Sequence, residues 1–155
     1  MTPHFSLTGL LRSVLVEDDA DDPGQGPSHA QIASRLAEWR HRGHRSIRML
    51  DLECGCGDRL LRAAAKAREL GFVSIEGRGV DRSPHNVRRA RRRAESEVHP
   101  STSLVFEIGE PIAALAAEHD GAADLILLSE ARPYPSSPLG AALDRVCAGF
   151  VLGDS

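Results

Sequence analysis

Aromatic side chains and cysteines are scarce in this chain, and each shortage narrows what the protein can be. Phe, Trp and Tyr make up 4% of the residues, so the core must consist mainly of Leu, Val, Ile and Ala. The three cysteines are few and odd in number, which argues against a disulfide framework and indicates a reducing compartment. Cys54 and Cys56 are followed by no second Cys or His pair at zinc-site spacing, so no metal site is expected.

Long apolar runs are also absent. The longest ones fall far short of the roughly 20 residues that a membrane-spanning helix needs, and no signal peptide is recognisable. We therefore expect a cytoplasmic protein that does not contact a membrane. Lysine is nearly missing as well, because Lys66 is the single lysine among 19 Lys and Arg residues. We interpret this predominance of arginine as a bias of genome composition rather than as a nucleic-acid signal.

What the chain does contain is typical of one soluble domain. Its 155 residues are 41% hydrophobic and 26% charged, which is enough to bury a core. The net charge of −3 hides an acidic cluster at 17–22 and a concentration of arginines in the middle. The pattern predicts an amphipathic helix at 5–16, an acidic linker up to residue 27, and the main domain over 28–155.

One stretch organises the rest of the chain. Residues 47–52 form a short apolar segment that stops at an acid, and a turn with Gly55 and Gly57 then leads into a helical pattern over 58–70. Glycine lets the backbone approach a ligand closely, and the free N–H groups at a helix start favour a negative group. The stretch therefore predicts a site for a nucleotide-like ligand.

Residues 51–57, which read Asp-Leu-Glu-Cys-Gly-Cys-Gly, resemble the first motif of class I S-adenosylmethionine-dependent methyltransferases. In that motif an acid precedes three glycines at alternate positions, and here Glu53 stands at the first of them. The resemblance extends over about 47–152. It implies an α/β, three-layer Rossmann-like fold with a mostly parallel sheet of about five strands, helices on both faces, and the final antiparallel strands missing. It also implies S-adenosylmethionine as the cofactor.

The remaining pattern alternates strands and helices, as a parallel sheet requires. Further strands are expected over 72–81, 103–108 and 124–130, with a fifth starting at 149. Further helices are expected over 28–41, 83–97, 111–118 and 138–148. In the family an N-terminal helix often covers the cofactor, so the helix at 5–16 would do this, or would pack on the sheet edge or on another subunit.

Acidic residues fall where these strands end. Asp81 lies 24 positions after Gly57, where dinucleotide-binding folds place an acid that accepts hydrogen bonds from ribose hydroxyls. The resemblance implies that Asp51, Gly55 and Gly57 hold the amino-acid end of the cofactor, and that Glu110 meets the adenine amino group. The helix that starts at residue 111 explains Glu110 equally well, because acids favour helix starts.

The predicted cofactor-binding residues are Asp51, Glu53, Gly55, Gly57, Asp81, Arg82 and Glu110. Glu130 and Tyr134 follow the fourth strand and are the predicted catalytic residues, with Glu130 as the first candidate for a base. Glu53 is the unexpected member of the set. A carboxylate aimed at the cofactor's own carboxylate would cost up to about 4 kcal/mol, or roughly a thousandfold in affinity. A Glu53 that points away, or that pairs with an arginine, would avoid this cost.

Several functions remain open at this point. The first is methyl transfer to the nitrogen or oxygen of a small molecule. The second is a degenerate domain that binds a homodimer partner or another chain at the sheet edge left open by the missing strands. Nucleic-acid methylation would suit the arginines at 88–93 and the Pro133–Tyr134 pair, but the helix lacks interleaved aromatics, so a nucleic-acid partner is less favoured. NAD binding is a lesser alternative, because the spacing is Gly-x-Gly.

Overall fold

The computed structural model describes residues 26–130 and 132–153. The helix expected at 5–16 and the acidic linker lie outside the described residues. The described strands are β1 (Ser46–Leu52), β2 (Ser74–Asp81), β3 (Thr102–Ile108), β4 (Ala123–Leu127) and β5 (Cys147–Leu152). The described helices are α1 (His29–His41), α2 (Asp58–Glu69), α3 (Pro84–Ser96), α4 (Pro111–Ala116) and α5 (Pro138–Val146).

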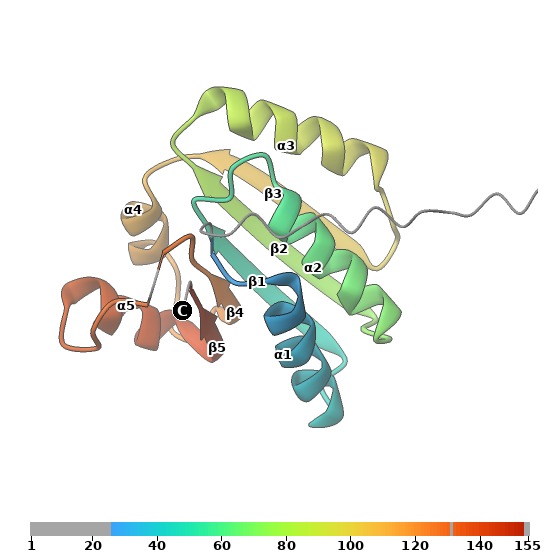
Figure 1. Cartoon of the computed structure of the whole chain (residues 1–155), viewed down its shortest axis with the longest axis horizontal. Coiled ribbons are helices and arrows are strands. Elements are labelled where there is room, and N and C mark those ends of the chain that lie inside the picture. The colour runs from blue at the N-terminus through green and yellow to red at the C-terminus, as the bar shows by residue number, and fades with distance from the viewer. Residues whose placement is uncertain (1–25, 131, 154–155) are drawn as a thin grey trace, which may run out of the picture.

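The five strands form one sheet in the order β3-β2-β1-β4-β5, and all of its pairings are parallel (Figure 1). The predicted α/β Rossmann-like fold is therefore confirmed. Strand β1 lies in the middle, with β2 on one side and β4 on the other. Strands β2 and β3 are thus added on one side of β1, and β4 and β5 on the other, so the strand order reverses at β1. In open parallel sheets the crevice at such a switch point, outside the carboxyl ends of the strands, is where ligands bind.

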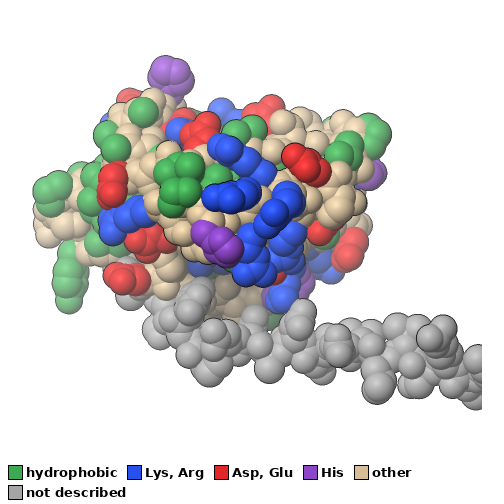
Figure 2. Space-filling view, turned by 90° about the horizontal axis from the view of Figure 1, so that it is seen from above, with side chains coloured by type: hydrophobic (Ala, Val, Ile, Leu, Met, Phe, Trp, Pro, Cys, Tyr) green, Lys and Arg blue, Asp and Glu red, His purple; other side chains and the backbone are tan. Residues whose placement is uncertain are grey.

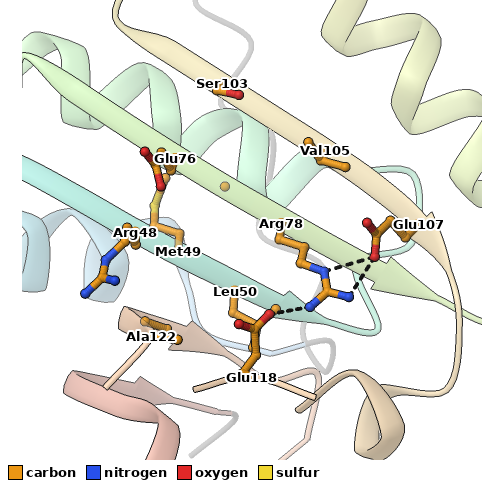
Figure 3. Close-up of a pocket in the computed structure, with 12 residues that line it drawn as sticks. Arg48, Met49, Leu50, Glu76, Arg78, Ser103, Val105, Glu107, Glu118 and Ala122 are labelled. Carbon is orange, nitrogen blue, oxygen red and sulfur yellow. Dashed lines mark hydrogen bonds and ion pairs between the residues drawn. The ribbon is translucent and has the colours of Figure 1, made fainter. Parts of the chain in front are cut away.

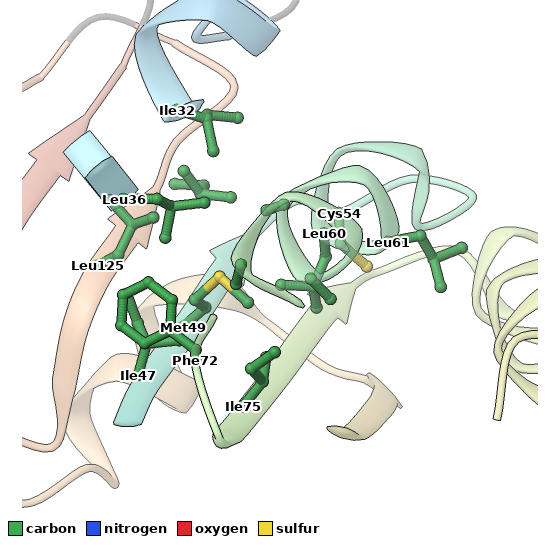
Figure 4. Close-up of a cluster of buried hydrophobic side chains, with 14 of the residues drawn as sticks. Ile32, Leu36, Ile47, Met49, Cys54, Leu60, Leu61, Phe72, Ile75 and Leu125 are labelled. Atoms are coloured by element: carbon green, nitrogen blue, oxygen red, sulfur yellow. The ribbon is translucent and has the colours of Figure 1, made fainter. Parts of the chain in front are cut away.

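Helices cover both faces of this sheet. Helices α1, α2 and α3 pack on one face, where their apolar side chains meet Met49, Ile75 and Phe106 of the strands. Figure 4 shows this cluster, with Leu36 of α1 and Leu60 of α2 turned toward the strands. Helices α4 and α5 pack on the other face through a second, smaller cluster. The three-layer arrangement follows from β1 and β4, whose side chains are mainly buried on both faces.

The starts of α1 and α3 are capped as their sequences predict. Ser28 and Gln31 form a reciprocal capping box at the start of α1, with Gln31 N donating to Ser28 Oγ at 3.2 Å. The Ser83 hydroxyl caps α3, and Pro84 follows it in the first turn. Gly57 begins α2 in a left-handed conformation, and no side chain caps that helix start.

Three strand boundaries differ from the expected ones by two or more residues, and one of them is the start of β5, which lies at Cys147 rather than at residue 149. Strand β2 starts at Ser74 rather than at residue 72, because Phe72 N still donates to Ala67 O of α2 and its ring is buried. Strand β4 ends at Leu127, three residues before the expected end, so that Glu130 lies in the loop beyond it. This loop starts at the carboxyl edge of the sheet and helps to form the site described next.

Candidate functional site

The turn between β1 and α2 contains two glycines with different surroundings. Gly57 has a φ of 83°, and a Cβ there would lie 3.0 Å from Ala90 Cβ and from the Phe106 ring. Gly57 is therefore required by packing. Gly55 has a φ of 56°, and a Cβ there would meet no atom within 4 Å. The backbone at Gly55 thus faces open space, where a ligand can approach it closely.

Asp81, at the end of β2, is bonded directly to this turn. Its Oδ2 accepts a hydrogen bond from Gly55 N at 2.9 Å, and its Oδ1 accepts from Ser83 N at 2.8 Å and from Asn86 Nδ2 at 3.3 Å. The structure therefore brings together the glycine turn and the acid that the spacing singled out. A carboxylate offers about four lone-pair sites, so Asp81 keeps one on Oδ2 for a ligand hydroxyl.

Asp51 is fully buried and bonded to a residue that the sequence analysis missed. Arg59, in the first turn of α2, donates from Nε to Asp51 Oδ2 at 3.3 Å and pairs with Oδ1 through Nη2. Burial raises the pKa of the Asp51 carboxyl, and the Arg59 charge opposes this shift. A cation in a first helical turn opposes the helix dipole, and this was the sequence signal available for Arg59.

The Arg59 guanidinium spans the carboxyl ends of the two central strands. Besides Asp51, it donates to Leu128 O at 3.2 Å and to Leu52 O at 3.4 Å. Gly26, just before α1, lies against it so closely that a Cβ there would be 2.1 Å from Arg59 Nη1. Arg59 thus joins β1, the loop after β4 and the chain in front of α1.

Glu53 is bonded to a serine rather than to an arginine, the pairing that was one of the expectations for it. It has a φ of 61°, the left-handed conformation that suits the glycine it replaces, and its side chain is exposed. Its Oε2 accepts a hydrogen bond from Ser129 Oγ at 2.6 Å. Glu53 therefore links the turn after β1 with the loop after β4, across the switch point of the sheet.

A pocket of about 380 Å³ opens beside this link. Its volume lies within the range of small-molecule sites. The lining residues are Leu52, Glu53, Arg82, Pro111, Ile112, Leu128, Ser129, Glu130, Pro133 and Leu139. The structure thus brings together three of the predicted site residues, Glu53, Arg82 and Glu130. Glu110 adjoins them through an ion pair of 2.8 Å with Arg82. Tyr134 is 84% exposed and does not line this pocket.

A second hollow, of about 300 Å³, lies away from this edge, on the face that α4 and α5 cover only in part. Figure 3 shows three of its charged side chains bonded to one another: Arg78 donates to Glu107 at 2.8 Å and pairs with Glu118. Because Arg78 already binds both carboxylates, this hollow is a weaker candidate for a ligand site than the pocket at the carboxyl edge.

The carboxyl edge can hold a ligand with several chemical groups. Asp81 offers an acceptor for hydroxyls, the backbone at Gly55 is open to close approach, and the uncapped start of α2 favours a negative group. These features fit a nucleoside that carries an amino acid. None of the described helices has the length and hydrophobicity of a membrane span. The described residues also contain no cluster of three metal-binding side chains.

Comparisons with known proteins identify the class to which this fold belongs. The chain has the Rossmann-like fold of class I S-adenosylmethionine-dependent methyltransferases, as the sequence predicted. It is similar to a protein of Methanococcus maripaludis assigned to the S-adenosylmethionine-dependent methyltransferases, with a TM-score of 0.50 and 19% identity over 79% of this chain and 55% of that one. It is also similar to a protein of Listeria monocytogenes assigned to the class I S-adenosylmethionine-dependent methyltransferases, with a TM-score of 0.51 and 18% identity over 63% of this chain and 28% of that one.

In sequence, the chain is similar to the 23S rRNA (uracil(1939)-C(5))-methyltransferase RlmD of Aeromonas hydrophila. The two are 29% identical over 131 residues, which make up 84% of this chain and 28% of the relative. The chain therefore spans less than a third of that protein. No family model matches the chain.

Proposed function

We propose that this domain takes part in methyl transfer from S-adenosylmethionine, which it binds at the carboxyl ends of β1, β2 and β4. The observation that carries the proposal is the 2.9 Å hydrogen bond from Gly55 N to Asp81, at the edge where Glu53 and Glu130 line a pocket. When bound, the cofactor supplies a methyl group on a sulfonium. The residues of the chain would hold the acceptor in line with that methyl group and exclude water.

Each binding residue has a role that its contacts support. Asp81 would accept a ribose hydroxyl at the free site of Oδ2, and the backbone at Gly55 would meet the amino-acid end. Glu110 would accept from the adenine amino group, since its ion pair with Arg82 is exposed and easily exchanged. Asp51 is buried against Arg59 and would position the turn rather than contact the cofactor.

Glu130 would act on the acceptor. Its side chain is exposed and lines the pocket, where its carboxylate can take a proton from an N–H or O–H nucleophile. Tyr134 lies outside the pocket and has no role in this proposal. A small molecule is the acceptor expected from the sequence, and the volume of about 380 Å³ is compatible with one.

RNA is the second candidate acceptor, and one observation favours it. The relative in Aeromonas hydrophila, which aligns with 84% of this chain, is named as an rRNA methyltransferase. In an RNA methyltransferase only the base that is methylated enters the pocket, while the rest of the RNA stays outside. An enzyme of this kind therefore needs a surface next to the pocket that binds the RNA backbone.

Calorimetric titration with S-adenosylmethionine and with its demethylated product tests the proposal. We expect both to bind the unmodified chain, and we expect Asp81→Ala to weaken binding by about tenfold or more, the value of one or two hydrogen bonds. The matched control is Glu69→Ala, which removes an exposed carboxylate at the opposite end of α2. Absence of binding at millimolar cofactor would overturn the proposal and favour the noncatalytic alternative.

A further inference from the structure

One face of α3 carries a dense positive charge. His85, Arg88, Arg89 and Arg92 recur at helical spacing and are all exposed. Figure 2 shows a group of Lys and Arg side chains on this side of the molecule, with a histidine beside it. The net charge of the chain is −3, so this concentration of positive charge is local. We call these four residues the α3 basic face.

The arginines of this face have no ion-pair or hydrogen-bond partner among the described residues, whereas their neighbours on the same helix do. Arg91 donates from Nε to Phe106 O at 2.8 Å, and Arg93 pairs with Asp58. Arg88 and Arg92 are spaced four residues apart, where like charges destabilise a helix. Helix stability therefore does not explain this grouping, and the three arginines are available to a partner.

The basic face lies at the pocket end of the helix. It starts two residues after Ser83, which caps α3 next to Asp81, and it extends for about 10 Å along the axis. The positive end of the helix dipole adds to its charge. Arg82 lies between this face and the pocket, which it lines, but its charge is compensated by the ion pair with Glu110. The acids Glu95 and Glu97 lie at the opposite end of the helix and do not interrupt this face.

We infer that the α3 basic face binds the phosphate backbone of a structured RNA whose reacting base enters the pocket. Arginine is well suited to phosphate, and several arginines on one face can contact successive phosphates. The face carries no Phe, Tyr or Trp on which single-stranded bases would stack, so it suits the backbone of a duplex. This inference rests on the proposed methyl transfer and identifies the class of acceptor.

Fluorescence anisotropy with a labelled RNA duplex of about 20 base pairs tests the inference. The variant Arg88→Gln/Arg89→Gln/Arg92→Gln is compared with Arg35→Gln/Arg42→Gln/Arg45→Gln, which removes three exposed arginines from the region of α1 and changes the net charge equally. We expect the first variant to bind about tenfold or more weakly at low salt, with a salt dependence reduced by about two to three phosphate contacts. The α1 variant should bind like the unmodified chain.

Several outcomes would overturn the inference. Equal losses of RNA affinity in the two variants would mean that only the net charge of the chain matters. Absence of RNA binding by the unmodified chain would exclude RNA as the partner. Tighter binding of the matching DNA duplex, or of phosphatidylserine vesicles, would identify a different occupant. Calorimetry with S-adenosylmethionine on the same variants keeps the two proposals separate, because the α3 variant should retain cofactor binding even where RNA binding is lost.

Discussion

Gly55 and Gly57 stand two positions apart with left-handed backbones, but they serve different purposes. At Gly57 a methyl group would meet Ala90 and the Phe106 ring, whereas at Gly55 it would project into open space. The first glycine is therefore needed by the fold, and the second by whatever approaches the turn.

Alanine at these two positions should separate stability from binding. We expect Gly57→Ala to lower the free energy of unfolding by about 2–4 kcal/mol, through backbone strain and overpacking. Gly55→Ala should cost about 1 kcal/mol, but should weaken S-adenosylmethionine binding by about tenfold or more. Urea unfolding and calorimetry measure the two effects. Equal cofactor affinity in Gly55→Ala and the unmodified chain would show that the ligand does not approach this backbone.

At this scale the sequence predicts positions better than orientations. The pairing of Asp81 with the glycine turn could be predicted, because parallel strands bring their carboxyl ends to one edge. The direction of Glu53 could not, because its partner Ser129 lies 76 residues further along the chain. The sequence marks Arg59 only as a cation in a first helical turn, because its contact with Leu128 forms only when β1 and β4 are neighbours.

Arg59 connects whole elements. It extends from α2 and bonds to Asp51 of β1 and to the loop after β4, so it fixes the helix start relative to the two central strands. The Asp51 side chain is 0% exposed and that of Arg59 13% exposed, so this is a buried pair. Removing one partner of such a pair leaves a buried charge uncompensated.

We expect Arg59→Met to lower the free energy of unfolding by about 3 kcal/mol near neutral pH. The loss should depend on pH. Burial raises the pKa of Asp51 above its ordinary value of 3.8, and without Arg59 nothing nearby opposes that shift. The folded variant then holds a proton that the unfolded chain has released, so stability falls as pH rises from 3.8 through the folded pKa. Urea unfolding across this range measures the slope.

The double variant Asp51→Asn/Arg59→Met is the control for this experiment. It removes the buried carboxylate, so it should recover part of the stability and lose the pH dependence. An Arg59→Met variant whose stability does not change between acid and neutral pH would contradict the explanation.

For the whole molecule, the strand order leaves β5 at one edge of the described sheet. An exposed edge strand presents unpaired backbone groups to other chains. The homodimer or partner chain expected from the sequence would bind here, and it stays a prediction. The parallel pairing of the strands could be predicted from the alternation of strands and helices, whereas the strand order and the hollow around Arg78 could not.

We expect the protein to self-associate through this edge. Sedimentation velocity should show a mass that rises with concentration, and Ala148→Lys in β5 should suppress the rise, because a charged edge disfavours strand pairing. The same substitution at Ala141, exposed on α5, is the matched control and should leave association unchanged. A monomer at every concentration would rule out this use of the edge.

The close contact between Gly26 and the Arg59 guanidinium has a consequence for how the protein responds to ligands. There is no room between the two, since a single added carbon at Gly26 would overlap Arg59 Nη1. A ligand carboxylate that formed an ion pair with this guanidinium from the Gly26 side would have to displace the peptide at Gly26. Ligand binding in the crevice would then be detectable by limited proteolysis, because a protease would cleave the chain near residue 26 faster when the ligand is bound. Unchanged digestion at saturating ligand would show that Arg59 stays covered.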